Sequence, residues 1–124
     1  MVDLRGYNFE KLNIYQRSLS LVEEVYRLTK EWPKEYLFDL TSQFRRAALS
    51  IPLNVAEGSG RAGKEAARFA AIARGSVQEC IPIIETSRRL GLIDGGVYQR
   101  LYDELTELSK MLSALQKRNL SSKL

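Results

Sequence analysis

Residues 40–64, LTSQFRRAALSIPLNVAEGSGRAGK, contain the pattern that decides the fold. Apolar side chains recur there at steps of three and four residues, which places them on one face of an α-helix: Leu40, Phe44, Ala47, Ile51 and Val55. A polar stripe lies beside this face, rotated by roughly 110° at about 100° per residue: Gln43, Arg46, Ser50, Asn54 and Glu57. Such groups hydrogen-bond one another, so the stripe predicts a polar network at a seam between helices or between subunits.

The size and composition of the chain favour a single globular domain over residues 1–124. No apolar run approaches the roughly 20 residues that cross a bilayer. The first residues also lack the apolar core of a signal peptide. Cys80 is the only cysteine of the chain, which excludes an intrachain disulfide. We therefore expect a cytoplasmic protein with no membrane partner.

The chain has no histidine, although histidine is the commonest general base and metal ligand of proteins. One cysteine without histidine cannot build a zinc site of the Cys/His kind within one chain. Ser50 or Ser76 as a nucleophile would need a lysine or carboxylate base beside it. Glu57 with Glu79, as an acid/base pair or metal site, is a poor ligand set by itself. We expect no catalysis, no metal and no cofactor.

Residues 58–65, GSGRAGKE, nearly match the phosphate-binding loop G-x-x-x-x-G-K-[ST]. Glu65 stands where that loop needs a hydroxyl group for magnesium. The segment also follows a predicted helix, whereas the phosphate-binding loop follows a strand. The glycines are better explained as a turn between two helices, where glycine adopts the backbone conformation that ends a helix.

The periodicity predicts four helices and no strands, over residues of about 9–31, 39–59, 64–90 and 95–118. Asn8 and Asp39 are the expected N-caps of the first two helices. Pro52 and Pro82 fall inside the second and third helices, where each should produce a kink. Short connections between long helices favour an all-α fold, an antiparallel up-down-up-down four-helix bundle.

The first and third helices carry more apolar surface than one bundle core covers. The apolar arc of the third helix spans roughly 180°, with Ser76 inside it and Glu79 at its rim. Exposed patches of this kind usually mark interfaces, so the pattern predicts self-association. A ring of copies would use two different surfaces of each subunit. The first helix has two adjacent seams: Leu12, Tyr15, Leu19, Val22 and Tyr26, beside Ile14, Leu21, Val25, Leu28 and Trp32.

The net charge of +4 permits contact with an anionic polymer without requiring it. Arg46 is interpreted as structural, paired with Glu57 or Glu79, because a guanidinium suits paired and partly buried sites. Arg45 is expected to be exposed, and Cys80 is interpreted as an inert core thiol. The basic residues fit a solvated surface and a nucleic-acid contact equally well, and the candidates are Arg45, Arg61, Lys64, Arg68, Arg74, Arg88 and Arg89.

Several motifs of the chain are similar to those of one family. They are Trp32-Pro33, Glu35-Tyr36, LTSQFRRAA over residues 40–48, Ser50-Ile51-Pro52, Asn54-Val55-Ala56-Glu57-Gly58, Phe69, Ile72-Ala73-Arg74-Gly75-Ser76 and Glu79. Over roughly residues 9–115 the chain resembles the bacterial four-helix-bundle proteins related to open reading frames in intervening sequences of large-subunit ribosomal RNA genes. Two positions depart from the pattern. Asp39 replaces a more usual glycine, and Pro82 lies where the family usually keeps an uninterrupted helix.

The resemblance implies a four-helix bundle that assembles into a ring, typically a homopentamer, with no enzymatic activity. It also implies a distant relation to the accessory protein of diversity-generating retroelements, a basic pentamer that binds reverse transcriptase and nucleic acid. We therefore expect a homo-oligomeric scaffold that presents a basic surface to RNA, DNA or a nucleic-acid enzyme. The alternative is a pure protein–protein interaction module in which the charge has no part.

Overall fold

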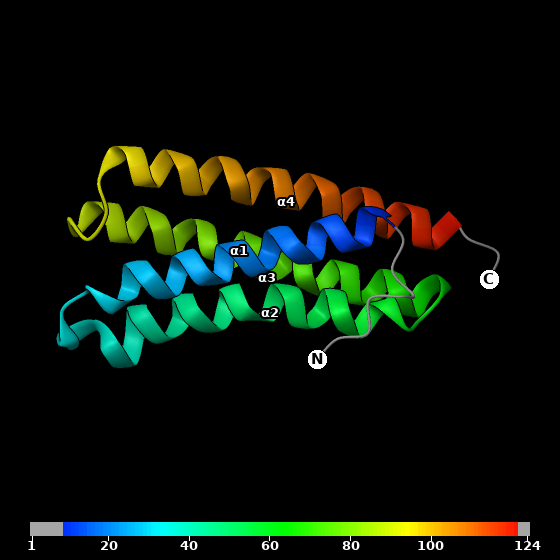
Figure 1. Ribbon diagram of the computed structural model, residues 1–124, viewed down its shortest axis with the longest axis horizontal. Coiled ribbons are helices and arrows are strands. Elements are labelled where there is room, and N and C mark those ends of the chain that lie inside the picture. Colours follow the sequence, from blue (N-terminus) through cyan, green and yellow to red (C-terminus); the bar gives the residue numbers. More distant parts are fainter. Residues whose placement is uncertain (1–8, 122–124) are drawn as a thin grey trace.

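The computed structural model describes residues 9–121, and its long elements are four α-helices. They are α1 (Phe9–Lys30), α2 (Ser42–Ser59), α3 (Gly63–Arg89) and α4 (Gly95–Ser121). The helices lie side by side and alternate in direction (Figure 1). The α1–α2 and α3–α4 connections therefore share one end of the molecule, which we call the double-turn end. This confirms the predicted all-α, antiparallel up-down-up-down four-helix bundle.

The connection between α1 and α2 differs from the prediction. A 3₁₀ turn, Lys34–Tyr36, is followed by a π-helical turn, Leu37–Thr41, that runs directly into α2. The expected N-cap at Asp39 is therefore wrong, because the backbone is already helical there and Thr41 makes no capping bond. The carboxylate of Asp39 instead accepts a hydrogen bond from the amide of Leu40. The other predicted N-cap, Asn8, lies outside the described residues.

The α3–α4 connection has local bonds at both helix ends. Gly91 adopts a left-handed φ of 79°, and the amide of Leu92 donates to the carbonyl of Ser87 at 2.8 Å. This is the hydrogen-bond pattern of a Schellman motif, for which glycine is the preferred residue. The carboxylate of Asp94 then accepts a bond of 2.8 Å from the amide of Val97, which caps the start of α4. At its other end, α4 extends to Ser121, beyond its predicted end at residue 118.

The helices α2 and α3 each continue through a proline. Pro52 is buried inside α2, and Pro82 is exposed inside α3. The predicted alternation of apolar and polar faces stays in phase across both positions, so each helix remains one element. One turn after Pro82, the hydroxyl of Thr86 donates a hydrogen bond of 2.8 Å to the carbonyl of Pro82.

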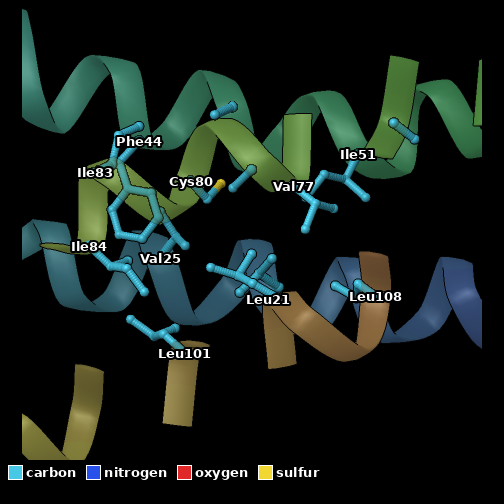
Figure 2. Close-up of a cluster of buried hydrophobic side chains, with 14 of the residues drawn as sticks. Leu21, Val25, Phe44, Ile51, Val77, Cys80, Ile83, Ile84, Leu101 and Leu108 are labelled. Carbon is cyan, nitrogen blue, oxygen red and sulfur yellow. The ribbon is translucent and has the colours of Figure 1, made fainter. Parts of the chain in front are cut away.

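The core runs the length of the bundle and receives side chains from all four helices (Figure 2). The inner stripe of α2 lies in it, with Phe44 and Ile51 fully buried. In α1 only one of the two predicted seams is buried, with Ile14 and Val25 at its centre. The other seam of α1 is half-buried, and its Tyr26 is 41% exposed. One bundle core therefore leaves part of the apolar surface of α1 uncovered.

Helices α2 and α3 approach each other closely at Gly58. A Cβ atom added to Gly58 would lie 2.9 Å from the Cβ of Phe69, and 3.6 Å from the carbonyl oxygen of Ala66. Real Cβ atoms do not approach so closely, so the absence of a side chain at Gly58 sets the spacing of these helices. Glycine frequently serves where two backbones come together in this way.

Neighbouring α1 and α4 are joined mainly by charges. They have far fewer backbone approaches than the α2–α3 and α3–α4 pairs. Three ion pairs cross the gap, namely Glu10–Arg118, Arg17–Glu104 and Glu24–Arg100. The residues on α1 are seven apart, about two helical turns, and alternate in sign. Outside the shared core, these ion pairs are the main contacts that join the two helices.

A pair of glycine substitutions should separate the close approach from helix propensity. We expect Gly58→Ala to lower the free energy of unfolding by about 1–3 kcal/mol, because the new Cβ forces α2 and α3 apart. Gly75→Ala is the control, since Gly75 lies inside α3 with no atom within 4 Å of an added Cβ. It should raise the free energy of unfolding by up to about 1 kcal/mol. Urea unfolding measures both. An unchanged Gly58→Ala protein would contradict the close packing.

Candidate functional site

The predicted polar network forms at the seam between α2 and α3, with Ser50 at its centre. The Oγ of Ser50 lies 2.8 Å from the hydroxyl of Ser76, which comes from α3. It also accepts a hydrogen bond of 3.0 Å from the amide nitrogen of Asn54, one turn along α2. The same nitrogen lies 2.8 Å from the carbonyl oxygen of Ser50. Three half-buried residues thus close one small network across the two helices.

The other members of the predicted network are not brought into it. Gln43, Arg46 and Glu79 are exposed, and no hydrogen bond or ion pair to them occurs within residues 9–121. The expected pairing of Arg46 with Glu57 or Glu79 is wrong for the single chain. Glu57 is bound by Arg61 instead, because Arg61 lies one helical turn away and Arg46 about three.

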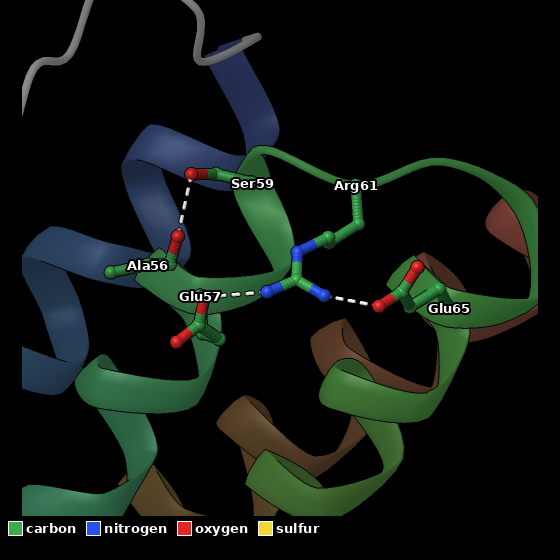
Figure 3. A network of polar contacts seen from close by, with 5 residues as sticks. All are labelled: Ala56, Glu57, Ser59, Arg61 and Glu65. Atoms are coloured by element: carbon green, nitrogen blue, oxygen red, sulfur yellow. Dashed lines mark hydrogen bonds and ion pairs between the residues drawn. The ribbon is translucent and has the colours of Figure 1, made fainter.

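Arg61 closes the turn between α2 and α3 (Figure 3). Its guanidinium donates to Glu57 at 3.0 Å and also pairs with Glu65, the residues four before and four after it. Its positive charge is therefore matched by two carboxylates within the same chain. Nearby, the hydroxyl of Ser59 donates a bond of 2.7 Å to the carbonyl of Ala56. The segment that nearly matches a phosphate-binding loop is thus an inter-helix turn held by ion pairs.

Arg45 and Arg46 have exchanged the environments that the sequence pattern predicted. Arg45 is half-buried against α1, where its Nε donates to the hydroxyl of Thr29 at 2.8 Å. Its guanidinium carbon also lies 4.7 Å from the ring centre of Tyr26. Arg46 is rotated about 100° further around α2 and is exposed. Arg45 is therefore a packing residue, and Arg46 is an exposed cation.

The remaining basic candidates lie along α3 in more than one group. Arg68 lies over the ring of Phe69, Arg74 is 3.4 Å from the hydroxyl of Ser113, and Arg88 lies over the ring of Tyr98. Lys64 and Arg89 are exposed. Arg68 and Arg88 are twenty residues apart, or about 30 Å along a helix. The structure of one chain thus places basic groups near both ends of α3 and does not gather them in one patch.

The reactive groups of the chain are held in unreactive surroundings. Burial, with a smaller contribution from the nearby charge of Glu79, raises the pKa of the Cys80 thiol to about 12. Ser50 and Ser76 bond to each other, and neither has a lysine or carboxylate partner among the described residues. Within residues 9–121, no three acidic or cysteine side chains gather where they could hold a metal ion. Nor is any helix there long and apolar enough to cross a membrane.

Two features were missed by reasoning from the sequence. The first is the α1–α4 charge pattern, which the seven-residue spacing of Glu10, Arg17 and Glu24 could have indicated. The second is the turn residue Phe38, whose side chain is 93% exposed. Phe38 lines a hollow of about 390 Å³ with Tyr26, Leu37 and Leu49, all of them exposed apolar residues. No periodic signal could have found it, because Phe38 belongs to the irregular connection.

These observations define the class of the protein: an antiparallel four-helix bundle with a hydroxyl–amide network between α2 and α3 and exposed apolar side chains beside it. A family model described as 23S rRNA-intervening sequence protein matches residues 10–114. The chain belongs to this family, as its motifs indicated. No curated protein matches the chain.

The Ser50 network should make a measurable contribution to stability. We expect Ser50→Ala to lower the free energy of unfolding by about 1 kcal/mol, since Ser76 and Asn54 both lose a bond to its hydroxyl. Ser109→Ala is the matched control. Ser109 is a half-buried serine of α4 with no side-chain hydrogen bond among the described residues. It should change the free energy by less than about 0.5 kcal/mol. Equal effects of the two substitutions in urea unfolding would argue against the network.

The burial of Cys80 predicts a thiol that does not react in the native protein. With a pKa of about 12, roughly one thiol in ten thousand is ionised at pH 8. A disulfide reagent at pH 8 should therefore leave Cys80 unmodified until urea unfolds the chain. Rapid modification without denaturant would contradict this environment.

The same shift sets a pH dependence of stability. Because the folded pKa lies above the ordinary value of about 8.5, the contribution of the neutral thiol is complete below that pH. It is lost as the pH rises from there to about 12. The free energy of unfolding of Cys80→Ala should therefore decline less over this range than that of the unchanged protein. Equal declines would count against the shift.

Proposed function

We propose that the protein is a non-catalytic scaffold that works as a homo-oligomeric ring and presents basic residues to RNA, DNA or a nucleic-acid enzyme. The observation that carries this proposal is the apolar surface left outside the bundle core. Phe38 is 93% exposed and Leu53 is 59% exposed, while Tyr26 and Leu49 are uncovered beside them. Contiguous apolar patches of this kind mark protein–protein interfaces. The family resemblance supports a closed ring, typically a pentamer.

Three cations on α3 support the nucleic-acid part of the proposal. Lys64, Arg68 and Arg89 are exposed and form no ion pair within the described residues. Each chain carries a net charge of +4, so every added copy of the ring adds another four positive charges. Repetition around a ring would turn a mildly basic chain into a strongly basic assembly. A field of that kind attracts anionic polymers.

The alternative is a protein–protein interaction module in which the ring matters and the charge does not. Two observations favour it. Arg61 is matched by two carboxylates, and Arg45 is packed against α1. The basic groups are also spread along the whole of α3. The two proposals differ in whether affinity for nucleic acid depends on the α3 cations.

Binding to mixed-sequence RNA and duplex DNA, measured against salt concentration, tests this difference. We expect affinity to fall steeply with salt, since phosphate contacts release counterions. The double variant Lys64→Gln/Arg68→Gln should bind more weakly. Each phosphate contact it removes should flatten the logarithmic salt slope by about 0.9 for duplex DNA, or about 0.7 for a single strand.

The control is Lys110→Gln/Lys117→Gln, which removes the same charge from exposed positions on α4. If both double variants lose affinity equally, the contact is with the overall charge and not with α3. If the unchanged protein does not bind at low salt, the nucleic-acid proposal is lost and the interaction module stands.

A further inference from the structure

Exposed apolar side chains lie along the α1–α2 side, two of them around the hollow that Tyr26 also lines, and we call this set the ridge. Its defining members are Phe38 in the turn, and Leu49 and Leu53 on α2. Leu49 and Leu53 are four residues apart, so they lie one above the other on the outer side of the helix. Between residues 42 and 56, α2 carries Arg45 and Arg46 and no acidic residue. The ridge is therefore apolar with a basic edge.

A groove runs along the seam between α1 and α4. Two hollows of about 660 and 490 Å³ open there, and the ion-paired residues Glu24 and Arg100 line both of them. The apolar part of their lining is Leu21, Leu28, Trp32, Pro33 and Leu92. The groove stays open because α1 and α4 are joined by long ion-paired side chains and have few close backbone approaches.

The ridge and the groove lie at the same level along the bundle. Arg45 contacts both Thr29 and Tyr26, so residue 45 of α2 is level with about residue 28 of α1. Because α1 and α2 are antiparallel with the same rise per residue, Leu49 is level with about residue 24 and Leu53 with about residue 20. Glu24 pairs with Arg100 inside the groove, and Ser20 lines its second hollow.

The turn residue Phe38 completes this match. It belongs to the α1–α2 connection, which lies at the double-turn end (Figure 1). The first hollow is lined by Trp32, Pro33, Gly91 and Leu92, which belong to the two connections at that end. A ring whose axis runs parallel to the bundle keeps every residue at its own level from one copy to the next. A side chain at the double-turn end can then contact only the same end of the neighbouring copy. Phe38, Leu49 and Leu53 each lie at a level along the bundle that the groove also covers.

We infer that, in the ring proposed above, the ridge of one copy docks in the α1–α4 groove of the next copy. The contact is heterologous, because ridge and groove are different surfaces of one chain, and such contacts close into rings. The charges agree with it. Arg46 is unpaired on the ridge side, while Glu31 in the first hollow and Asp103 in the second have no ion pair within residues 9–121. The groove lining has one cation without an ion pair within residues 9–121, Arg27, so acidic groups outnumber basic ones among its unpaired residues.

Two variants that each disable one surface test the inference. Leu53→Asp places a charge on the ridge, and Ser20→Arg fills the second hollow of the groove. Both positions are exposed, and circular dichroism checks that each variant is helical. Each variant alone should sediment as a particle of about 14.1 kDa, the mass of one chain. Phe38→Asp provides a second ridge variant with the same expectation.

Mixing the two variants gives the decisive result. The Leu53→Asp chain keeps a working groove and the Ser20→Arg chain keeps a working ridge, so one intact contact remains between them. The mixture should therefore form a heterodimer of twice the single-chain mass and nothing larger. A mixture that stays monomeric overturns the inference, as does either variant that still assembles as the unchanged protein does.

A control locates the contact on the correct side of α2. Ile72→Asp places the same charge at another exposed apolar residue, on α3. It should assemble like the unchanged protein. Loss of assembly in Ile72→Asp but not in Leu53→Asp would move the interface to the α2–α3 side and overturn the inference. An unchanged protein that is monomeric at high concentration would instead refute the oligomer itself, which is a different failure.

Discussion

The packing of α2 on several sides is the constraint on which the rest of the structure depends. Its inner face holds Phe44 and Ile51 in the core. One flank contacts α1 through Arg45, and the other contacts α3 through Ser50 and the close approach at Gly58. The side of a bundle helix that faces water normally carries charged and polar residues. The outer side of α2 has leucines there, so one copy of the chain leaves this helix incompletely covered.

The seam between α1 and α4 is built on the opposite principle. Its three ion pairs are partly exposed, and pairs of this kind contribute about 0.2–1 kcal/mol each. The hydrogen bond from Arg17 to Glu104 is strong enough to raise the pKa of Arg17. Even so, these pairs add little stability compared with a packed leucine seam. Their alternating signs along α1 instead match each of the three residues to an opposite charge on α4 in the observed register.

The sequence could predict the helices better than the surroundings of single side chains. Periodicity located all four helices, because apolar spacing reports which residues share a face. It could not decide which of the two apolar seams of α1 is buried, since that depends on where α2 and α4 lie. The same limit explains Arg45 and Arg46. They differ by about 100° around one helix, and only the position of α1 decides which of them is packed. Of the predicted polar network, Ser50, Asn54 and Ser76 meet because their positions face the α2–α3 seam. The exposure of Phe38 depends on a π-helical turn that no pattern in the sequence indicated.

The two unusual sides of the bundle are easier to understand together than separately. If α1 and α4 were joined by leucines, the groove between them would close, and the outer leucines of α2 would have no concave surface to enter. If the outer side of α2 were charged, the open α1–α4 seam would be only a loss of stability in a small domain, where the margin between folded and unfolded states is about 5–15 kcal/mol. The outer leucines of α2 and the open α1–α4 seam lie on different sides of one chain. They can therefore cover each other only between two copies. A heterologous contact between them would cover the leucines and add a fifth helix to the weakest seam.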